Sequence, residues 1–262
     1  MSPRRIRLDL EYDGTDFVGW QIQPEGRTVQ GELRDALNRL LQQHVVPVGS
    51  GRTDAGVHAL GQVAHFDTAS THEPERMMRA LNSILPADIA VTAVGDVAAD
   101  FHACYSPISK RYRYRISTSK SPLQRRQVWT LYRELDVGAM QDASQHLHGT
   151  HGFEVFCNHD PVPDSFLCEI LHCQWCVAGA DMTLEIEANR FLRHMVRIIV
   201  GTLVEVGRGK MAASAMADLL TEPAASTQSA HPARREDAGP TVPAQGLCLV
   251  YVRYPEERGS AL

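Results

Sequence analysis

The order in which strand-like and helix-like periodicities alternate is the feature that most restricts the fold of this chain. Residues 6–12 alternate apolar and polar side chains, which is typical of a half-buried strand. Thr28 precedes a run with apolar residues every three or four positions, so we expect it to cap a helix. A second helix is predicted at about 74–85, before Pro86, and further strands near 45–50, 62–68 and 89–94. The turns are too short for parallel crossovers throughout, so these elements predict an α+β lobe with a largely antiparallel sheet.

The second half of the chain repeats this style without a detectable sequence repeat. Its predicted strands are RYRYRIST, VWTLY, a hairpin of 168–177 with 181–189, and the closing GLCLVYVRYP. Its predicted helices cover 136–147, 190–206 and 211–221. We therefore divide the 262 residues into lobes 1–105 and 106–262. Residues 222–246 contain four prolines and Val242 as their only large apolar residue, so we expect a flexible loop at about 222–246.

Several classes of protein have no support in the sequence. No apolar run reaches the roughly 18 residues that a membrane helix needs. The N-terminal segment has no apolar region of a secretory signal, which favours a cytoplasmic protein. Walker, GxGxxG and HExxH patterns do not occur, so ATP use, dinucleotide binding and metal hydrolysis have no motif behind them.

The six cysteines are too sparse for a disulfide scaffold. Cys173 and Cys176 have the spacing of half a zinc site, with Cys157, Cys168 and His172 nearby. Their segment is predicted to be a strand, on which residues three apart point to opposite faces. We therefore expect no metal site and interpret these thiols as small buried side chains.

The densest candidate for chemistry is Gly51-Arg-Thr-Asp-Ala-Gly-Val-His58. Its glycines allow tight turns or close approach to a ligand. Arg52 beside Asp54 would keep that carboxylate ionised, as a nucleophile or general base requires. The alternative is that Asp54 caps a turn and Arg52 forms an ordinary surface pair.

A local excess of positive charge contrasts with the net charge of −5. Residues 109–126 hold seven cations and no acid, which favours phosphate contact at one place. Tyr112 and Tyr114 would share one face of a strand and could stack on bases, with Arg111 among the arginines opposite. Tyrosines in the core and arginines in solvent are the alternative.

The predicted helix 190–206 carries Arg190, His194, Arg197 and Gly201 along a single stripe. This helix is mostly apolar, so Arg197 is expected to be partly buried and to need an anionic partner. Asp54 is one candidate for that partner, and another carboxylate in a structural salt bridge is the alternative.

Together these motifs resemble the tRNA pseudouridine synthase A family. The matching segments run in order along most of the chain: EYDGTDFVGWQ from Glu11, GRTDAGVH from Gly51, NSILPADI from Asn82, DFHA from Asp100, KRYRY from Lys110, HMVRIIVGTLVEVG from His194 and AGPTVPAQGL from Ala238.

The resemblance implies two RRM-like lobes with a catalytic cleft between them, a homodimer and no cofactor. It implies isomerisation of uridines 38 to 40 in the tRNA anticodon stem-loop. Asp54 would be the essential carboxylate, Arg52 would hold the displaced base, Tyr112 would pack on the uracil and Arg197 would pair with Asp54. We also expect Lys110 and Arg111 to contact the RNA backbone.

Three departures from the family pattern affect expected RNA contacts. Cys104 stands where arginine usually follows FHA, the segment 157–168 lacks the expected basic residues, and 222–236 is either inserted or diverged. Two other functions remain open. A non-catalytic RNA-binding module would not need Asp54, and a glycosidase-like enzyme would need a second carboxylate.

Overall fold

The computed structural model describes residues 3–222 and 233–255, which divide along the chain into two units. Unit 1 runs to Ile108 and includes the segment from Cys248 onward, and unit 2 is Ser109–Leu247. Our division at residue 105 placed the closing strand in the second lobe, and this was wrong. The closing strand pairs in parallel with a strand of unit 1, Cys248 beside His58.

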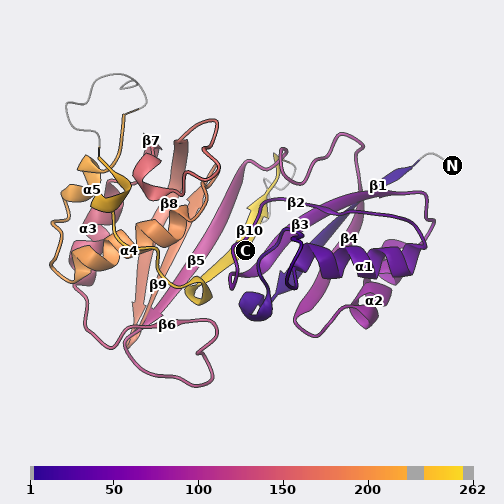
Figure 1. Ribbon diagram of the computed structural model, residues 1–262, viewed down its shortest axis with the longest axis horizontal. Helices are drawn as coiled ribbons and strands as arrows, with labels where there is room; N and C mark the ends of the chain where they lie inside the picture. The colour runs from indigo at the N-terminus through magenta and orange to yellow at the C-terminus, as the bar shows by residue number, and fades with distance from the viewer. Residues whose placement is uncertain (1–2, 223–232, 256–262) are drawn as a thin grey trace. The chain divides into compact units, whose positions relative to one another are not determined.

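Unit 1 is an α+β unit built on a mostly antiparallel sheet (Figure 1). Its elements are β1 (Arg4–Tyr12), η1 (Gly14–Asp16), α1 (Val29–Leu41), β2 (Val48–Gly49), β3 (His58–Thr68), α2 (Pro74–Ile84), β4 (Ile89–Val97) and β10 (Leu247–Arg253). The strand order is β4–β1–β3–β10, with β2 also on β3, and only β10 runs parallel to its partner in this unit.

The predicted alternation and helix cap of unit 1 are confirmed. Ile6, Leu8 and Leu10 of β1 are fully buried, and α1 and α2 cover this face of the sheet (Figure 1). The Thr28 side chain accepts a hydrogen bond from the backbone N–H of Gly31 at 3.2 Å, which caps α1. The cap therefore fixes the point at which the chain preceding Thr28 enters α1.

Unit 2 has the same class of architecture. Its elements are β5 (Ser109–Ser117), β6 (Trp129–Thr130), α3 (Val137–Gln145), β7 (Gly149–Gly152), η2 (Glu154–Phe156), β8 (Leu167–Ala178), β9 (Asp181–Ala188), α4 (Met195–Gly207), α5 (Ala215–Asp218), η3 (Arg235–Asp237) and η4 (Ala244–Gly246). The strand order is β5–β9–β8–β7 with antiparallel pairing, and β6 runs parallel to β5.

The predicted helix over 190–206 begins later than expected. The backbone of His194 has a φ of 64°, in the left-handed region, and α4 starts at Met195. Arg190 and His194 therefore precede the helix, and the single stripe that we predicted through Arg197 does not exist. The apolar spacing of Phe191 and Met195 imitated a helical period across a turn.

The predicted flexible loop over 222–246 was also wrong for its described part. Residues 223–232 lie outside the described residues, but the segment 238–246 packs closely on α4 of the same unit. Val242 is buried, and a Cβ atom on Gly201 of α4 would lie 1.9 Å from the carbonyl oxygen of Pro240. The backbone N–H of Gly239 donates to Thr202 Oγ1 at 2.9 Å. Glycines on both surfaces thus let this segment lie against α4.

The remaining expectations concern cysteines and membranes. Cys173 is buried and Cys176 is exposed, so the predicted opposite faces of β8 are confirmed. Among residues 3–222 and 233–255, no cluster of three potential metal-ligating side chains occurs. Within the same ranges, every helix is too short or too polar to cross a bilayer.

Candidate active site

Asp54 lies in an irregular loop that joins β2 to β3 in unit 1. The backbone N–H of Val57 donates to the Asp54 carbonyl at 3.1 Å, closing a turn, and the N–H of Trp20 donates to the Thr53 carbonyl at 3.0 Å. The Asp54 side chain is half-buried and that of Arg52 is exposed. The backbone that carries the carboxylate is therefore held although it belongs to no helix or strand.

Two glycines of the segment 13–20 make this support possible. A Cβ atom on Gly14 would lie 1.9 Å from the carbonyl oxygen of Val57. Gly19 has a φ of +103°, and its Cβ would lie 2.7 Å from the Thr53 carbonyl oxygen. Only glycine lets the two backbones approach so closely. We call the segment 13–20 the platform of the Asp54 loop.

Buried polar side chains of unit 1 form hydrogen bonds with the Asp54 loop. The Tyr12 hydroxyl lies 2.8 Å from Thr53 Oγ1. The Gln62 amide donates to the Gly51 carbonyl at 3.1 Å, and its oxygen accepts from the Ser50 hydroxyl at 2.7 Å. Burial raises the pKa of Tyr12, so its hydroxyl stays neutral. These polar groups are satisfied inside the protein, which keeps one loop conformation.

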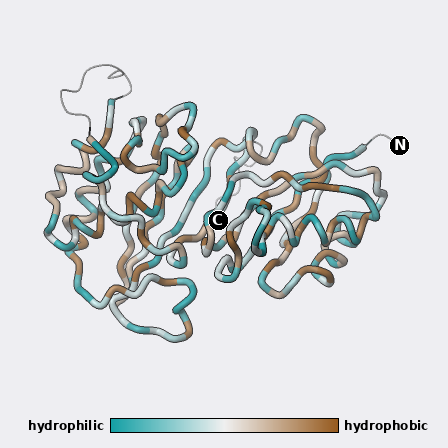
Figure 2. Tube along the Cα trace, in the orientation of Figure 1, coloured by the Kyte–Doolittle hydropathy of each residue, from teal (hydrophilic) through white to brown (hydrophobic). Residues whose placement is uncertain are grey.

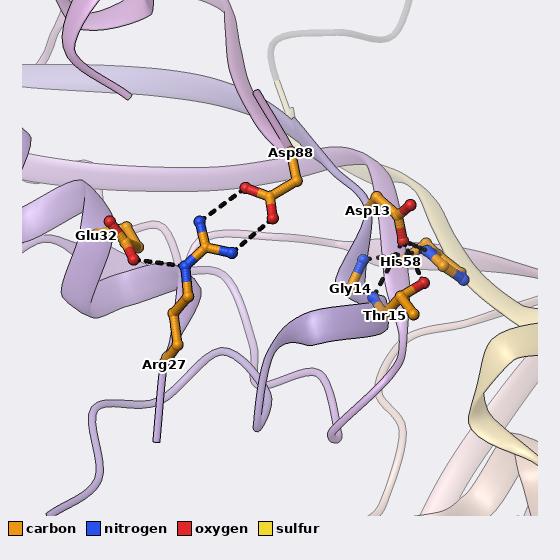
Figure 3. Close-up of polar contacts among 7 residues, drawn as sticks. All are labelled: Asp13, Gly14, Thr15, Arg27, Glu32, His58 and Asp88. Carbon is orange, nitrogen blue, oxygen red and sulfur yellow. Dashed lines mark hydrogen bonds and ion pairs between the residues drawn. The ribbon is translucent and has the colours of Figure 1, made fainter. Parts of the chain in front are cut away.

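Figure 3 shows charged groups at the platform. His58 Nδ1 accepts from the backbone N–H of Gly14 at 3.1 Å and lies 3.1 Å from the Asp13 carboxylate. Asp13 Oδ1 also accepts from the Thr15 N–H at 3.0 Å. The side chain of His58, four residues after Asp54, thus contacts the turn that begins the platform.

Arg27 ties the platform to the rest of unit 1 (Figure 3). Its guanidinium donates to both oxygens of Asp88 at 2.6 and 2.9 Å and to Glu32 at 2.6 Å. It also lies 4.3 Å from the centre of the Phe17 ring. These acidic partners raise the pKa of Arg27 through hydrogen bonds, led by Asp88. A two-oxygen contact of this kind fixes direction as well as charge.

Tyr112 lies on β5 of unit 2, beside a residue that the sequence patterns did not reveal. The ring of Phe191 meets the Tyr112 ring edge-on, with centroids 5.1 Å apart and an angle of 89°. Phe191 reaches this place because the chain does not enter α4 until Met195. Tyr112 is partly exposed, whereas Tyr114 is fully buried, so the alternative interpretation of a core tyrosine holds for Tyr114.

Arg197 is held by the segment that packs on α4. Its Nε donates to the Val242 carbonyl at 2.8 Å. The Tyr114 hydroxyl donates to the neighbouring Pro243 carbonyl at 2.7 Å, and burial raises the pKa of Tyr114. The side chain of Arg197 is half-buried, as we expected. The motif AGPTVPAQG therefore positions the guanidinium group of Arg197 as well as linking η3 to β10.

Two of the three arginines of β5 have acidic partners within their own sheet. Arg111 donates to Glu187 at 2.7 Å, and Arg113 donates to Glu185 at 2.8 Å. The register explains these pairs, because Arg111 faces Glu187 and Arg113 faces Glu185 across the β5–β9 ladder. Lys110 lies next to them on the strand, opposite Ala188. The carboxylates that balance this charge come from about 75 residues further along the chain.

The predicted site residues thus fall into two groups. Arg52 and Asp54 share one loop of unit 1, and Lys110, Arg111, Tyr112 and Arg197 belong to unit 2. Several of the residues that support them lie in the matching segments EYDGTDFVGWQ and AGPTVPAQGL, but their supporting roles were not foreseen from the sequence. Gly14 and Gly19 carried a physical signal for such a role, since glycines in a short conformationally demanding segment often mark close backbone approach.

Comparison with known proteins explains why these motifs occur together. Residues 10–106 and 143–255 match the family described as tRNA pseudouridine synthase. The chain belongs to this family. A tRNA pseudouridine synthase A of Moorella thermoacetica is 44% identical over 253 residues, covering 95% of this chain and 99% of the relative.

Two further relatives carry the same description. The protein of Chloroflexus aurantiacus (strain J-10-fl) is 43% identical over 96% of this chain and 89% of its own length. That of Geobacter sp. (strain M21) is 41% identical over 97% of this chain and 100% of its own length. The family is one of isomerases, so the resemblance that we drew from the motifs is confirmed.

Proposed function

We propose that this protein converts uridine to pseudouridine in the anticodon stem-loop of tRNA, at positions 38 to 40, with Asp54 as the essential carboxylate. The observation that carries the proposal is the support of the Asp54 loop. Backbone contacts from Gly14, Gly19 and Trp20 and a buried hydroxyl contact from Tyr12 fix a carboxylate that remains partly accessible. Such support is what a reacting group needs.

The proposed reaction breaks the bond between N1 of uracil and C1′ of the sugar and joins C5 to C1′. C5 loses a proton and N1 gains one, so the product is an isomer and no cofactor or metal is required. Cleavage places positive character on C1′, which an ionised Asp54 would stabilise or capture. Removal of a sugar proton by Asp54 is the other route. Both routes need the carboxylate charged.

Reaching C1′ requires the target nucleotide to leave its helix, at a cost of a few kcal/mol. We assign Arg52 to holding the displaced base, because its exposed side chain is two residues from Asp54. We assign Tyr112 to packing on the uracil, with Phe191 fixing the direction of its ring. Tyr112 or a water molecule would receive the C5 proton.

Arg197 is proposed to balance the negative charge of Asp54. The hydrogen bond from Arg197 Nε to the Val242 carbonyl fixes the orientation of its planar guanidinium group. We assign Lys110 and Arg111 to the RNA backbone, and Arg111 also pairs with Glu187. A cytoplasmic homodimer with RRM-like lobes completes the proposal.

The test is release of tritium from tRNA labelled at C5 of uridine. Asp54→Asn should abolish release and preserve tRNA binding, because the amide has the same shape and no charge. Asp35→Asn is the matched control, since Asp35 is an exposed aspartate of the same unit, and it should release tritium at the wild-type rate.

Two results would contradict the proposal. Undiminished release by Asp54→Asn would remove this carboxylate from the mechanism. Binding without release by the wild-type protein on every tRNA would support the non-catalytic RNA-binding module instead.

A further inference from the structure

The run of cations from Lys110 to Arg126 divides into two parts with different surroundings. In the strand part, Arg111 and Arg113 donate to Glu187 and Glu185, as described above. Glu187 is only 3% exposed and also accepts from the Ser109 hydroxyl at 2.6 Å. Much of the charge on this strand is therefore balanced inside unit 2 before any RNA arrives.

The second part lies in the loop that joins β5 to β6, residues 118–128. Lys120, Arg125 and Arg126 all have exposed side chains. No Asp or Glu occurs anywhere from Ser109 to Arg133. In Figure 2 much of this loop, next to β6, has hydrophilic colours. The loop therefore concentrates three cations on a surface segment that contains no acid.

An apolar side chain stands among these cations. Leu123 is 96% exposed, between Lys120 and the two arginines. The end of the loop is nevertheless anchored, because Val128 and Leu131 are buried and Trp129 packs edge-on against Tyr114 with centroids 6.3 Å apart. A leucine displayed on an anchored loop between cations has the composition of a nucleic-acid contact, in which apolar groups meet sugars and bases.

We propose that this β5–β6 loop docks on a helical part of the RNA substrate outside the target nucleotide. Lys120, Arg125 and Arg126 would contact phosphates, and Leu123 would pack against the sugars of the wide, shallow minor groove. This inference rests on the proposed function for the identity of the RNA. It adds the exposed cations of the loop to the RNA contacts that we assigned to the strand.

The position of the loop suits this task. Tyr112 and Ser117 are five residues apart on β5, which is about 17 Å along a strand. The loop thus continues from the end of the strand that carries the proposed uracil contact.

The experiment measures tRNA affinity at several salt concentrations. The triple variant Lys120→Gln, Arg125→Gln and Arg126→Gln should bind at least about tenfold more weakly at low salt. Its plot of log affinity against log salt should be shallower by about 2 to 3, because each lost duplex phosphate contact contributes about 0.9. Leu123→Ser should weaken binding by a similar factor at every salt concentration and keep the wild-type slope.

The matched control has the same change of net charge on the helices of unit 1. Arg34→Gln, Arg39→Gln and Arg79→Gln together should retain the wild-type slope. Equal slopes for wild type and the loop variant, or equal losses in the loop and control variants, would overturn the inference. Tritium release in the same samples keeps the two proposals apart. If the wild-type protein binds tRNA with the expected dependence on the loop but releases no tritium, the proposed reaction is contradicted and the docking role of the loop is supported.

Discussion

The contact between Gly14 and the Asp54 loop offers a direct test of the platform. In Gly14→Ala the new methyl carbon would lie 1.9 Å from the Val57 carbonyl oxygen and 2.5 Å from its carbonyl carbon, whereas real contacts of this kind essentially never fall below 3.0 Å. Either η1 or the loop must therefore move by about 1 Å. Val57 is joined to Asp54 by a hydrogen bond of 3.1 Å, so the movement reaches the carboxylate.

Two magnitudes follow from this displacement. A misplacement of about 1 Å in a reacting group costs on the order of 100-fold in rate. Forcing a methyl group into a packed site costs about 1–3 kcal/mol of stability, an amount that a stable domain tolerates. We therefore expect Gly14→Ala to remain folded, to bind tRNA and to release tritium about 100-fold more slowly in single-turnover reactions.

Gly95→Ala is the control for this prediction. It adds the same methyl group to the same unit, on β4, where nothing lies within 4 Å of the new carbon. Thermal unfolding of both variants separates lost stability from lost rate. The reasoning about the platform is refuted if folded Gly14→Ala releases tritium as fast as Gly95→Ala.

Two further predictions concern titration and charge. Burial lowers the pKa of His65 to about 4 from 6.5, so between these values the imidazole is neutral in the folded state and protonated in the unfolded chain. The free energy of unfolding should therefore fall as the pH drops from about 6.5 toward 4. Its slope should be up to ~1.4 kcal/mol per pH unit steeper than that of His65→Gln. Urea unfolding across that range checks this, and parallel slopes would contradict it. Arg111→Ala should lower the free energy of unfolding by about 2–3 kcal/mol, because the buried Glu187 carboxylate loses its partner. Adding Glu187→Gln should recover most of this loss. Additive losses in this double-mutant cycle would show that the pair is not coupled.

Local periodicity was sufficient for most of the elements. β1 alternates because one face packs under helices, and α1 begins at Thr28 because a threonine hydroxyl satisfies a helix N–H. It failed near Phe191, where apolar spacing continued through a turn. The left-handed conformation of His194 ends the connection between β9 and α4. A pattern of hydrophobic residues does not encode a single dihedral angle.

The candidate site divides in the same way. Asp54 stands out in the sequence because a carboxylate, an arginine and glycines lie within a few residues of each other. The platform does not, because Gly14 and Val57 approach through backbone atoms that all residue types share. The segment around Val242 was misjudged for a related reason. Its prolines and small residues look like a solvated loop, yet they pack because Gly201 and Gly239 remove the side chains between two backbones.

In the proposed binding mode, the distribution of charge would let a chain with a net charge of −5 bind RNA without binding every polyanion. Glu185 and Glu187 pair with Arg111 and Arg113 of β5, and the β5–β6 loop presents further exposed cations in a segment without acidic residues. Beyond about 10 Å at physiological salt such a surface attracts little, so an RNA gains from it only when its helix already lies against the loop. The acidic remainder of the surface opposes other placements. If Glu185 and Glu187 perform this function, replacing both by glutamine should strengthen binding to unrelated RNA more than binding to tRNA, because the freed arginines would attract any phosphate backbone.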